Sequence, residues 1–195
     1  MRKIERRDVK NIIEYELVRD DVRRAIIKLK KCRRISVGPY LSFVFENRDT
    51  VLFQIEEMMR AERTVHEDRI QEEIDVYNSL IPEKNELSAT MLIEITNVKR
   101  IKTVLDRMMG MDHGGRVWLQ FGGEKVYAVF EEGRSNEEKI SAVHFIRFPF
   151  SDQQVRRFRA GEDAAYLYVR HPNYRRRAKL TPELRVSLSE DLEGR

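Results

Sequence analysis

The sequence predicts an α+β protein: an N-terminal helical lobe with a small hairpin, packed on a mostly antiparallel sheet with two or three helices. Apolar residues recur at helical spacing through much of the first 81 residues. From residue 87 the pattern changes to alternation, which is typical of a half-buried strand. Gly122 and Gly123 then separate two strand-like stretches and predict a hairpin. A ferredoxin-like sandwich with one extra strand is one topology that fits this order.

Residues 1–84 are expected to form the helical lobe. Its predicted elements are a helix over 8–31, short strands over 35–37 and 41–45 around the Gly38-Pro39 turn, a helix over about 50–62, and a helix from Thr64 that stops before Pro82. Asn47 or Asp49 is expected to cap the helix over about 50–62. Thr64 and Glu67 have the spacing of a capping box, in which each side chain satisfies a free backbone donor of the other.

Residues 85–195 are expected to form the sheet lobe, joined to the first through the linker candidate 82–86 within one compact domain. The predicted elements are strands over 87–95, 117–121, 125–130, 140–150 and 164–169, helices around 98–109 and from 152 to Gly161, and a last helix opened by Thr181-Pro182. Ser151 and Gln154 predict a second capping box at the start of the penultimate helix.

Composition bounds the class of protein. The chain has 195 residues, enough to bury a core, with 41% hydrophobic and 36% charged residues. Its apolar runs are too short to span a membrane, and no apolar segment follows the N-terminal charges, so a cytoplasmic protein is expected. The net charge of +4 is a balance of 37 basic and 33 acidic residues, which mainly indicates solubility.

A polar cluster is the first candidate site. Its ligand- or partner-binding candidates are Glu46, Asn47, Arg48, Arg60, Glu62, Glu131, Glu132 and Arg134. If the first lobe folds onto the sheet, these groups could converge in one pocket of an enzyme or ligand sensor. The alternative is ordinary surface pairing, since Glu56 and Arg60 lie four residues apart on one helix and Ser135 can cap a turn with Glu138.

A basic stretch near the C-terminus is the second candidate site. Its nucleic-acid candidates are Arg170, His171, Tyr174, Arg175, Arg176 and Arg177. Tyr166 and Tyr168 share one face of the preceding strand, and arginines beside aromatic rings are typical of proteins that hold single-stranded nucleic acid. The basic end of the first helix, 28–34, could contribute. The alternative is a basic surface loop, because the net charge is modest.

No catalytic or metal-binding signature is present in the sequence. Phosphate-binding glycine loops and serine-nucleophile motifs are missing. Glu62 and His66 lie four residues apart, whereas di-iron helices use a three-residue spacing. Cys32 is the single cysteine, so an internal disulfide or an iron–sulfur cluster held by this chain is excluded. We therefore expect no catalytic residue, no metal and no cofactor.

Several stretches, taken together, resemble a bacterial family known as domain of unknown function 3501. They occur in the family's order and cover nearly the whole chain: 34–39, 45–51, 57–62, 86–90, 130–135, His171-Pro172 and Asp191-Leu192. The resemblance brings no activity with it. It does imply a gene neighbourhood, since members of the family are often encoded beside rubrerythrin-like non-haem iron proteins and an iron–sulfur oxidoreductase subunit.

The resemblance implies a non-catalytic accessory or binding protein in a redox or peroxide-handling system, with non-haem iron or iron–sulfur proteins as partners. Its partner surface would include the 46–62 corner and the 131–134 turn. Nucleic-acid binding and the Glu/Arg pocket are the alternatives. No membrane partner is expected. A homodimer could form through the aromatic faces that carry Phe145, Tyr166 and Tyr168.

Overall fold

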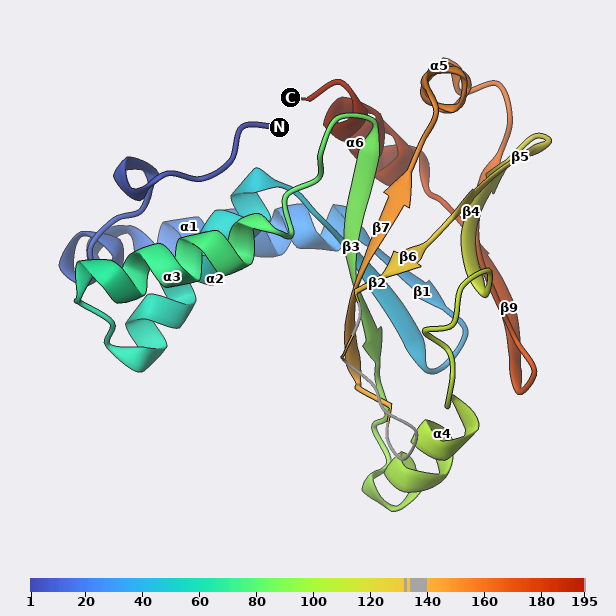
Figure 1. Ribbon diagram of the computed structural model, residues 1–195, viewed down its shortest axis with the longest axis horizontal. Helices are drawn as coiled ribbons and strands as arrows, with labels where there is room; N and C mark the ends of the chain where they lie inside the picture. The colour runs from blue at the N-terminus through green and yellow to red at the C-terminus, as the bar shows by residue number, and fades with distance from the viewer. Residues whose placement is uncertain (132, 134–139, 195) are drawn as a thin grey trace.

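Two antiparallel sheets surround the main apolar core (Figure 1). This computed structural model describes residues 1–131, 133 and 140–194. Sheet A contains, in spatial order, β1 (Arg34–Val37), β2 (Leu41–Glu46), β3 (Glu86–Ile93), β7 (Val143–Pro149) and β6 (Val129–Phe130). Sheet B contains β5 (Glu124–Tyr127), β4 (Val117–Phe121), β8 (Ala165–His171) and β9 (Tyr174–Lys179).

A single residue, Ala128, joins the two sheets. It separates β5 of sheet B from β6 of sheet A, and its N–H donates to the carbonyl of Val117 at 2.9 Å. On the other long side, the hydroxyl of Tyr174 in β9 donates to the carbonyl of Val37 in β1. The sheets therefore face each other as a sandwich that is tied along both sides, with their inward side chains forming the core.

Helices account for the rest of the regular structure. The helical segments of the described chain are η1 (Arg6–Asp8), α1 (Ile12–Cys32), α2 (Arg48–Glu62), α3 (Glu67–Asn78), η2 (Val98–Arg100), α4 (Ile101–Arg107), α5 (Asp152–Ala160) and α6 (Pro182–Leu192). Together with the two sheets they confirm the predicted α+β class.

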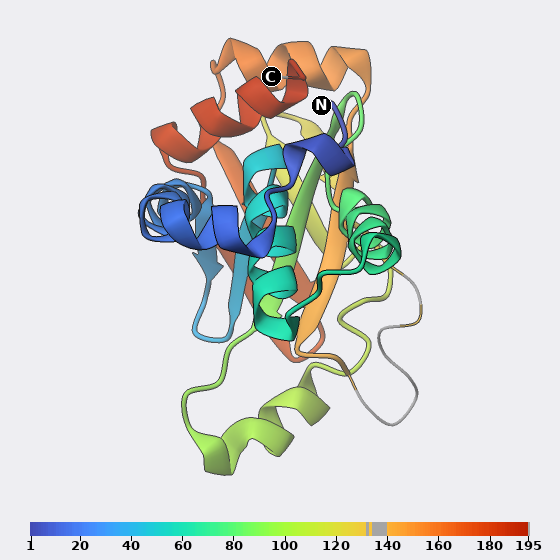
Figure 2. The same cartoon turned by 90° about the vertical axis from the view of Figure 1, so that its left-hand side faces the viewer.

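The helices are distributed unevenly over the sandwich. Figure 2 shows α1, α2 and α3 in front of sheet A, where Val51, Ile55 and Ile74 form a second apolar core. At one end of the sandwich α4 contributes Val104 to the main core, and at the other end α5 and α6 contribute residues such as Leu188. In Figure 1 none of the described helices lies over the outer face of sheet B. That face is the uncovered surface of the fold.

Local signals placed most helix starts correctly. Asn47 caps α2 by accepting from the backbone of Thr50, and Ser151 forms the predicted capping box at α5. Thr181 caps α6 with Pro182 in its first turn. These predictions hold because each side chain bonds a backbone donor only a few residues away.

Three expectations differ from the structure. The Thr64–Glu67 capping box is not formed: α3 begins after His66, which makes no side-chain cap, and the carboxylate of Glu67 instead accepts from Arg6 at 2.6 Å. The strand β9 was not predicted. The strands also divide between two sheets, whereas a ferredoxin-like sandwich would place them in one. Apart from these differences, β2 pairs with β3 along its whole length, so the two expected lobes share sheet A.

A buried arginine fixes α1 and α6 to sheet A. Arg33, the residue after α1, is 1% exposed. Its guanidinium donates to the carbonyls of Phe45 and Glu46 at 2.8 and 3.2 Å and to the hydroxyl of Ser187 at 2.6 Å, and it pairs with the buried carboxylate of Asp191. A charge so far from water is tolerated only when its hydrogen bonds and its counter-ion are complete.

Removing Asp191 should therefore destabilise the protein strongly. We expect Asp191→Ala to lower the free energy of unfolding by about 3–5 kcal/mol, because it leaves the charge of Arg33 buried without its partner. Urea denaturation followed by circular dichroism measures this. The exposed control Asp21→Ala, which breaks only the surface pair with Arg24, should change stability by less than about 1 kcal/mol. Equal effects of the two substitutions would contradict a structural role for the buried pair.

Candidate functional site

The predicted polar corner is a closed hydrogen-bond network. Glu46, at the end of β2, is 2% exposed. Its carboxylate accepts from the hydroxyls of Thr50 and Thr90 at 2.6 and 2.7 Å and from the amide of Gln54 at 3.3 Å. Asn47 is occupied as the cap of α2. Both residues therefore fasten α2 to sheet A.

The charged residues along α2 bind neighbouring segments. Arg48 Nη2 lies 2.8 Å from Asp8 Oδ2 of η1, and Arg60 forms an ion pair with Glu16 of α1. Glu62 is exposed in the last turn of α2. Arg48 and Arg60 thus tie α2 to η1 and α1, and the expected Glu56–Arg60 pair within α2 is replaced by contacts of Arg60 with Glu16 and of Glu56 with Lys10.

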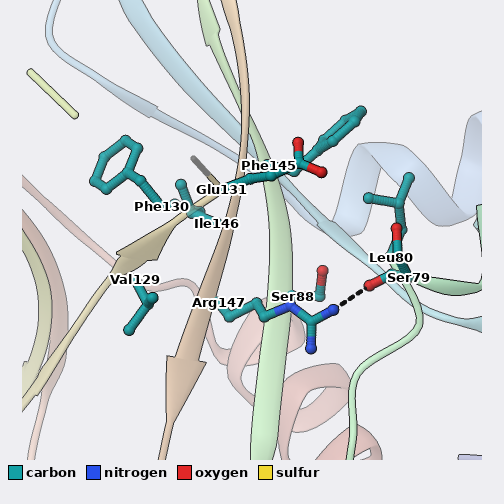
Figure 3. A pocket seen from close by; sticks show the side chains of 9 residues that line it. All are labelled: Ser79, Leu80, Ser88, Val129, Phe130, Glu131, Phe145, Ile146 and Arg147. Atoms are coloured by element: carbon teal, nitrogen blue, oxygen red, sulfur yellow. Dashed lines mark hydrogen bonds between the residues drawn. The ribbon is translucent and has the colours of Figure 1, made fainter. Parts of the chain in front are cut away.

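Glu131 lines a pocket at the β6 edge of sheet A (Figure 3). The pocket has a volume of about 190 Å³ and is lined by Ser79, Leu80, Ser88, Val129, Phe130, Glu131, Phe145, Ile146 and Arg147. The guanidinium of Arg147 donates to the carbonyl of Ser79, as Figure 3 shows, and to Glu86 at 3.0 Å. The backbone N–H of Glu131 donates to Phe145 at 3.0 Å. Glu132 and Arg134 lie outside the described residues.

The register of sheet A places Glu46 and Glu131 toward the same face but not in one pocket. Glu46 pairs with Ser88, Ser88 with Arg147, and Arg147 with Val129, so this row crosses four strands. Glu46 lies at the β2 end of the row, beneath α2, whereas Glu131 follows β6 at the opposite edge. Strands β3 and β7 separate the two carboxylates, and Glu46 is not among the residues that line the pocket.

Aromatic rings form a row across the outer face of sheet B. Tyr127 of β5 is paired with Trp118 of β4, Trp118 with Tyr168 of β8, and Tyr168 with Arg177 of β9. The rings of Trp118 and Tyr168 are stacked, with centroids 5.1 Å apart and planes at 3°. The centroid of Tyr127 lies 5.9 Å from that of Trp118, and Tyr127 is 46% exposed. We refer to Tyr127, Trp118 and Tyr168 as the aromatic row.

Cations flank the aromatic row on the same face. They are exposed and come from three strands: Lys125, Arg170, Arg175, Arg177 and Lys179. Lys125 Nζ lies 5.5 Å from the centroid of the Trp118 ring, and the guanidinium of Arg177 lies 5.7 Å from that of Tyr168. Glu124 is the one acidic residue of the four strands, and it lies 3.7 Å from Arg157 of α5. The outer face is therefore basic throughout.

Two arginines of this face oppose each other directly. Arg170 of β8 is the register partner of Arg175 of β9. Like charges in directly opposed cross-strand positions destabilise a sheet. A groove of about 510 Å³ runs beside them, lined by Trp118, Tyr168, Val169, Arg170, Arg175, Arg176 and Arg177. An unfavourable charge pair beside an aromatic groove is expected where an anion binds.

The predicted basic stretch divides between this face and the interior. Arg170, Arg175 and Arg177 reach the outer face. His171 and Tyr174 are buried: His171 Nε2 lies 2.9 Å from the carbonyl oxygen of Met109, and burial lowers the pKa of this histidine. Arg176 belongs to both sides: it borders the groove and donates to the carbonyl of Arg175 at 2.8 Å, and its guanidinium lies 5.8 Å from the centroid of the Tyr174 ring on the other side of β9.

Sequence reasoning missed part of this face, namely Trp118, Lys125 and Tyr127, whereas Lys179 belongs to the predicted basic stretch 170–179. The alternation of 117–121 and 125–127 contains the signal, since Trp118 and Tyr127 occupy outward positions of a predicted hairpin. The residues predicted for a homodimer are likewise separated: Phe145 packs against the second core beside sheet A, whereas Tyr166 and Tyr168 belong to sheet B.

The fold and this surface define an α+β protein built on a two-sheet sandwich with one helix-free aromatic and basic face. Over residues 3–192 the chain matches the model of the family described as "Protein of unknown function (DUF3501)". The chain belongs to this family, which confirms the resemblance seen in the sequence.

Comparison with solved structures gives the same relationship. A crystal structure of a protein from Burkholderia pseudomallei, described as a novel protein of unknown function, is 34% identical to this chain. The match covers 98% of this chain and 100% of that one, with a TM-score of 0.90. None of the curated proteins compared with the chain is significantly similar to it.

Two features are absent from the described residues. No group of three or more histidine, cysteine, aspartate or glutamate side chains there is placed to hold a metal ion. No helix in that part of the chain is both long enough and apolar enough to cross a membrane.

The contact between η1 and α2 should make the free energy of unfolding depend on pH in the acid range. The backbone N–H of Glu5, together with Arg2 and Arg48, lowers the pKa of Asp8 from 3.8 to about 2. Because this folded-state pKa is depressed, the stabilisation is complete above pH 3.8 and is lost as the pH falls toward 2. Urea unfolding measured at pH 5 and at pH 2.5 should show a smaller difference for Asp8→Asn than for the unmodified protein. An identical pH dependence would argue against this role for Asp8.

Proposed function

We propose that this protein binds single-stranded nucleic acid on the outer face of sheet B. The observation that supports the proposal is the aromatic row, flanked by five exposed cations on the face that the described helices leave uncovered. Proteins that hold single strands combine rings on which bases stack with basic groups that follow the phosphates. In RNA-binding four-stranded sheets, such rings hold two or three bases.

The geometry favours a single strand over a duplex. Stacking on a protein ring requires a base whose face is free, and bases in a duplex already stack on one another. Duplex readers insert a helix or a two-stranded ribbon into a groove. The outer face of sheet B presents side chains on a broad surface and no such projection, so it suits unpaired bases.

The side chains on the outer face of sheet B are held in place before any ligand binds. Arg177 donates to the hydroxyl of Tyr168 at 2.8 Å, and its guanidinium lies 5.1 Å from the centroid of Tyr166. The Trp118 ring is held between Tyr168 and Lys125. Side chains already held in place lose little conformational freedom on binding, which favours affinity. The face therefore offers bases a rigid surface and phosphates nearby cations.

A second proposal rests on the resemblance alone. It is the accessory role in a redox or peroxide-handling system, with non-haem iron or iron–sulfur proteins as partners. Its supporting observation is the gene neighbourhood of the family, and its partner surface would be the pocket beside Glu131. A pull-down from the source organism that recovers no iron or redox protein would count against it. The two proposals concern different faces and can be tested separately.

Intrinsic fluorescence gives a direct test of binding, because Trp118 is the single tryptophan of the chain. We expect short oligo(dT) and oligo(rU) to quench its emission at low salt and to be released as salt rises, since phosphate contacts displace counterions. An abasic oligonucleotide of equal length keeps the phosphates and lacks the bases, so it should bind more weakly. Absence of quenching and of binding at low salt would end the proposal.

Replacing the opposed arginines should separate binding from stability. The double variant Arg170→Gln, Arg175→Gln removes two phosphate contacts and should reduce the slope of log K against log salt by about 1.4. Because it also relieves a like-charge pair, its urea midpoint should not fall. The matched control Lys28→Gln, Lys31→Gln removes two exposed cations of α1, which lies beside sheet A and away from the outer face of sheet B, and should leave the affinity unchanged. An equal loss of affinity in the control would place the contacts elsewhere.

Loss of one ring should weaken stacking. Tyr127→Ala removes the most exposed member of the aromatic row, on the edge strand β5. We expect affinity for oligo(dT) to fall roughly 5- to 100-fold, as base–aromatic stacking contributes about 1–3 kcal/mol per base. Tyr127→Phe keeps the ring and should bind like the unmodified protein. Fluorescence anisotropy with a labelled oligonucleotide measures both affinities. Equal affinities of the two variants would exclude stacking at this position.

A further inference from the structure

A second aromatic and basic cluster lies on the opposite side of β9. The ring centroids of Tyr40 and Tyr174 are 6.3 Å apart. The guanidinium of Arg100, in η2, lies 6.0 Å from the centroid of Tyr40, and that of Arg176 lies 5.8 Å from the centroid of Tyr174. Arg100 and Arg176 are exposed and Tyr40 is half-buried. We refer to these four residues as the edge cluster.

The edge cluster is held against the turn between β1 and β2. The hydroxyl of Tyr174 donates to the carbonyl of Val37 and accepts from the N–H of Tyr40 at 3.4 Å. Gly38 adopts a φ of +74°, and a Cβ there would collide with the Tyr174 hydroxyl and lie 2.8 Å from Cγ of Arg176. Only glycine allows this close approach, so the position of Arg176 is set by the backbone packed beneath it.

Strand β9 carries cations on both of its faces. Arg175, Arg177 and Lys179 point to the side of the aromatic row, and Arg176 points to the side of the edge cluster. Since β9 is the edge strand of sheet B, the basic surface continues around that edge. The row of register partners that begins at Tyr127 ends at Arg177 on β9. A nucleic-acid strand lying along this row would therefore leave the sheet at the edge cluster.

We propose that the edge cluster extends the binding site and that a bound single strand passes around β9. This inference rests on the proposed function and adds the length and path of the ligand. The aromatic row would hold about two bases, on Tyr127 and Tyr168, because the Trp118 ring is buried between its neighbours. The edge cluster adds the ring of Tyr40 for about one more base, with Arg100 and Arg176 placed for two phosphates. The complete ligand is a strand of about six nucleotides that bends at the edge.

A length series tests the path. Oligo(dT) of about three nucleotides should bind the unmodified protein and the double variant Arg100→Gln, Arg176→Gln equally, since it occupies the aromatic row alone. A strand of about six nucleotides should bind the unmodified protein more tightly than the short one. In the double variant most of this gain should be lost, and the salt slope for the longer strand should fall by about 1.4.

Further variants keep the test independent of folding. Tyr40→Ala should weaken the longer strand about fivefold or more and leave the short strand unaffected. The Lys28→Gln, Lys31→Gln protein should behave as the unmodified protein with both lengths. The inference is overturned if the double variant binds the longer strand as tightly as the unmodified protein does. A failure of every oligonucleotide to bind at low salt would instead remove the proposed function, and this inference with it.

Discussion

The burial of one charge determines how the parts of this protein fit together. Arg33 lies at the end of α1, and its guanidinium donates to two carbonyls at the end of β2. Its counter-ion is Asp191 on α6, which is 158 residues away in sequence. Because an uncompensated charge in the interior is very unfavourable, these three elements must come together around Arg33. α1 is thereby fixed beside sheet A and α6 at one end of the sandwich. The helices then cover sheet A and the two ends, and they leave sheet B open.

The open face differs from an ordinary protein surface in its charge. Surfaces usually mix both signs, and elsewhere among the described residues many arginines have acidic partners, such as Arg6 with Glu67 and Arg60 with Glu16. On sheet B the cations contact tyrosine and tryptophan rings in place of carboxylates. Natural proteins retain locally unfavourable arrangements mainly where they serve function, so this departure points to the surface that recognises another molecule.

The sequence predicts interactions between residues that are close along the chain and misses those between residues that are far apart along it. Capping by Asn47, Ser151 and Thr181 depends on bonds to the next few residues and was predictable. Strand β9 was hidden because Arg175, Arg176 and Arg177 are all polar, which erases the alternation although the side chains still alternate in space. The division into two sheets depends on one residue between β5 and β6, and no periodic pattern records it. Likewise, the basic end of the first helix was predicted only as a possible nucleic-acid contact, whereas Arg33 within it is buried and its partner comes from the other end of the chain.

The single-residue junction at Ala128 also links the two faces mechanically. Tyr127 belongs to the aromatic row, and Val129, two residues later, lines the pocket beside Glu131. If β6 slides along β7, the displacement must be absorbed by the backbone of Ala128, which is hydrogen-bonded to β4, or be passed on to the tyrosine. Closely packed cores deform little, so the second route is favoured. A displacement at one face is therefore expected to reach the other through the backbone at Ala128.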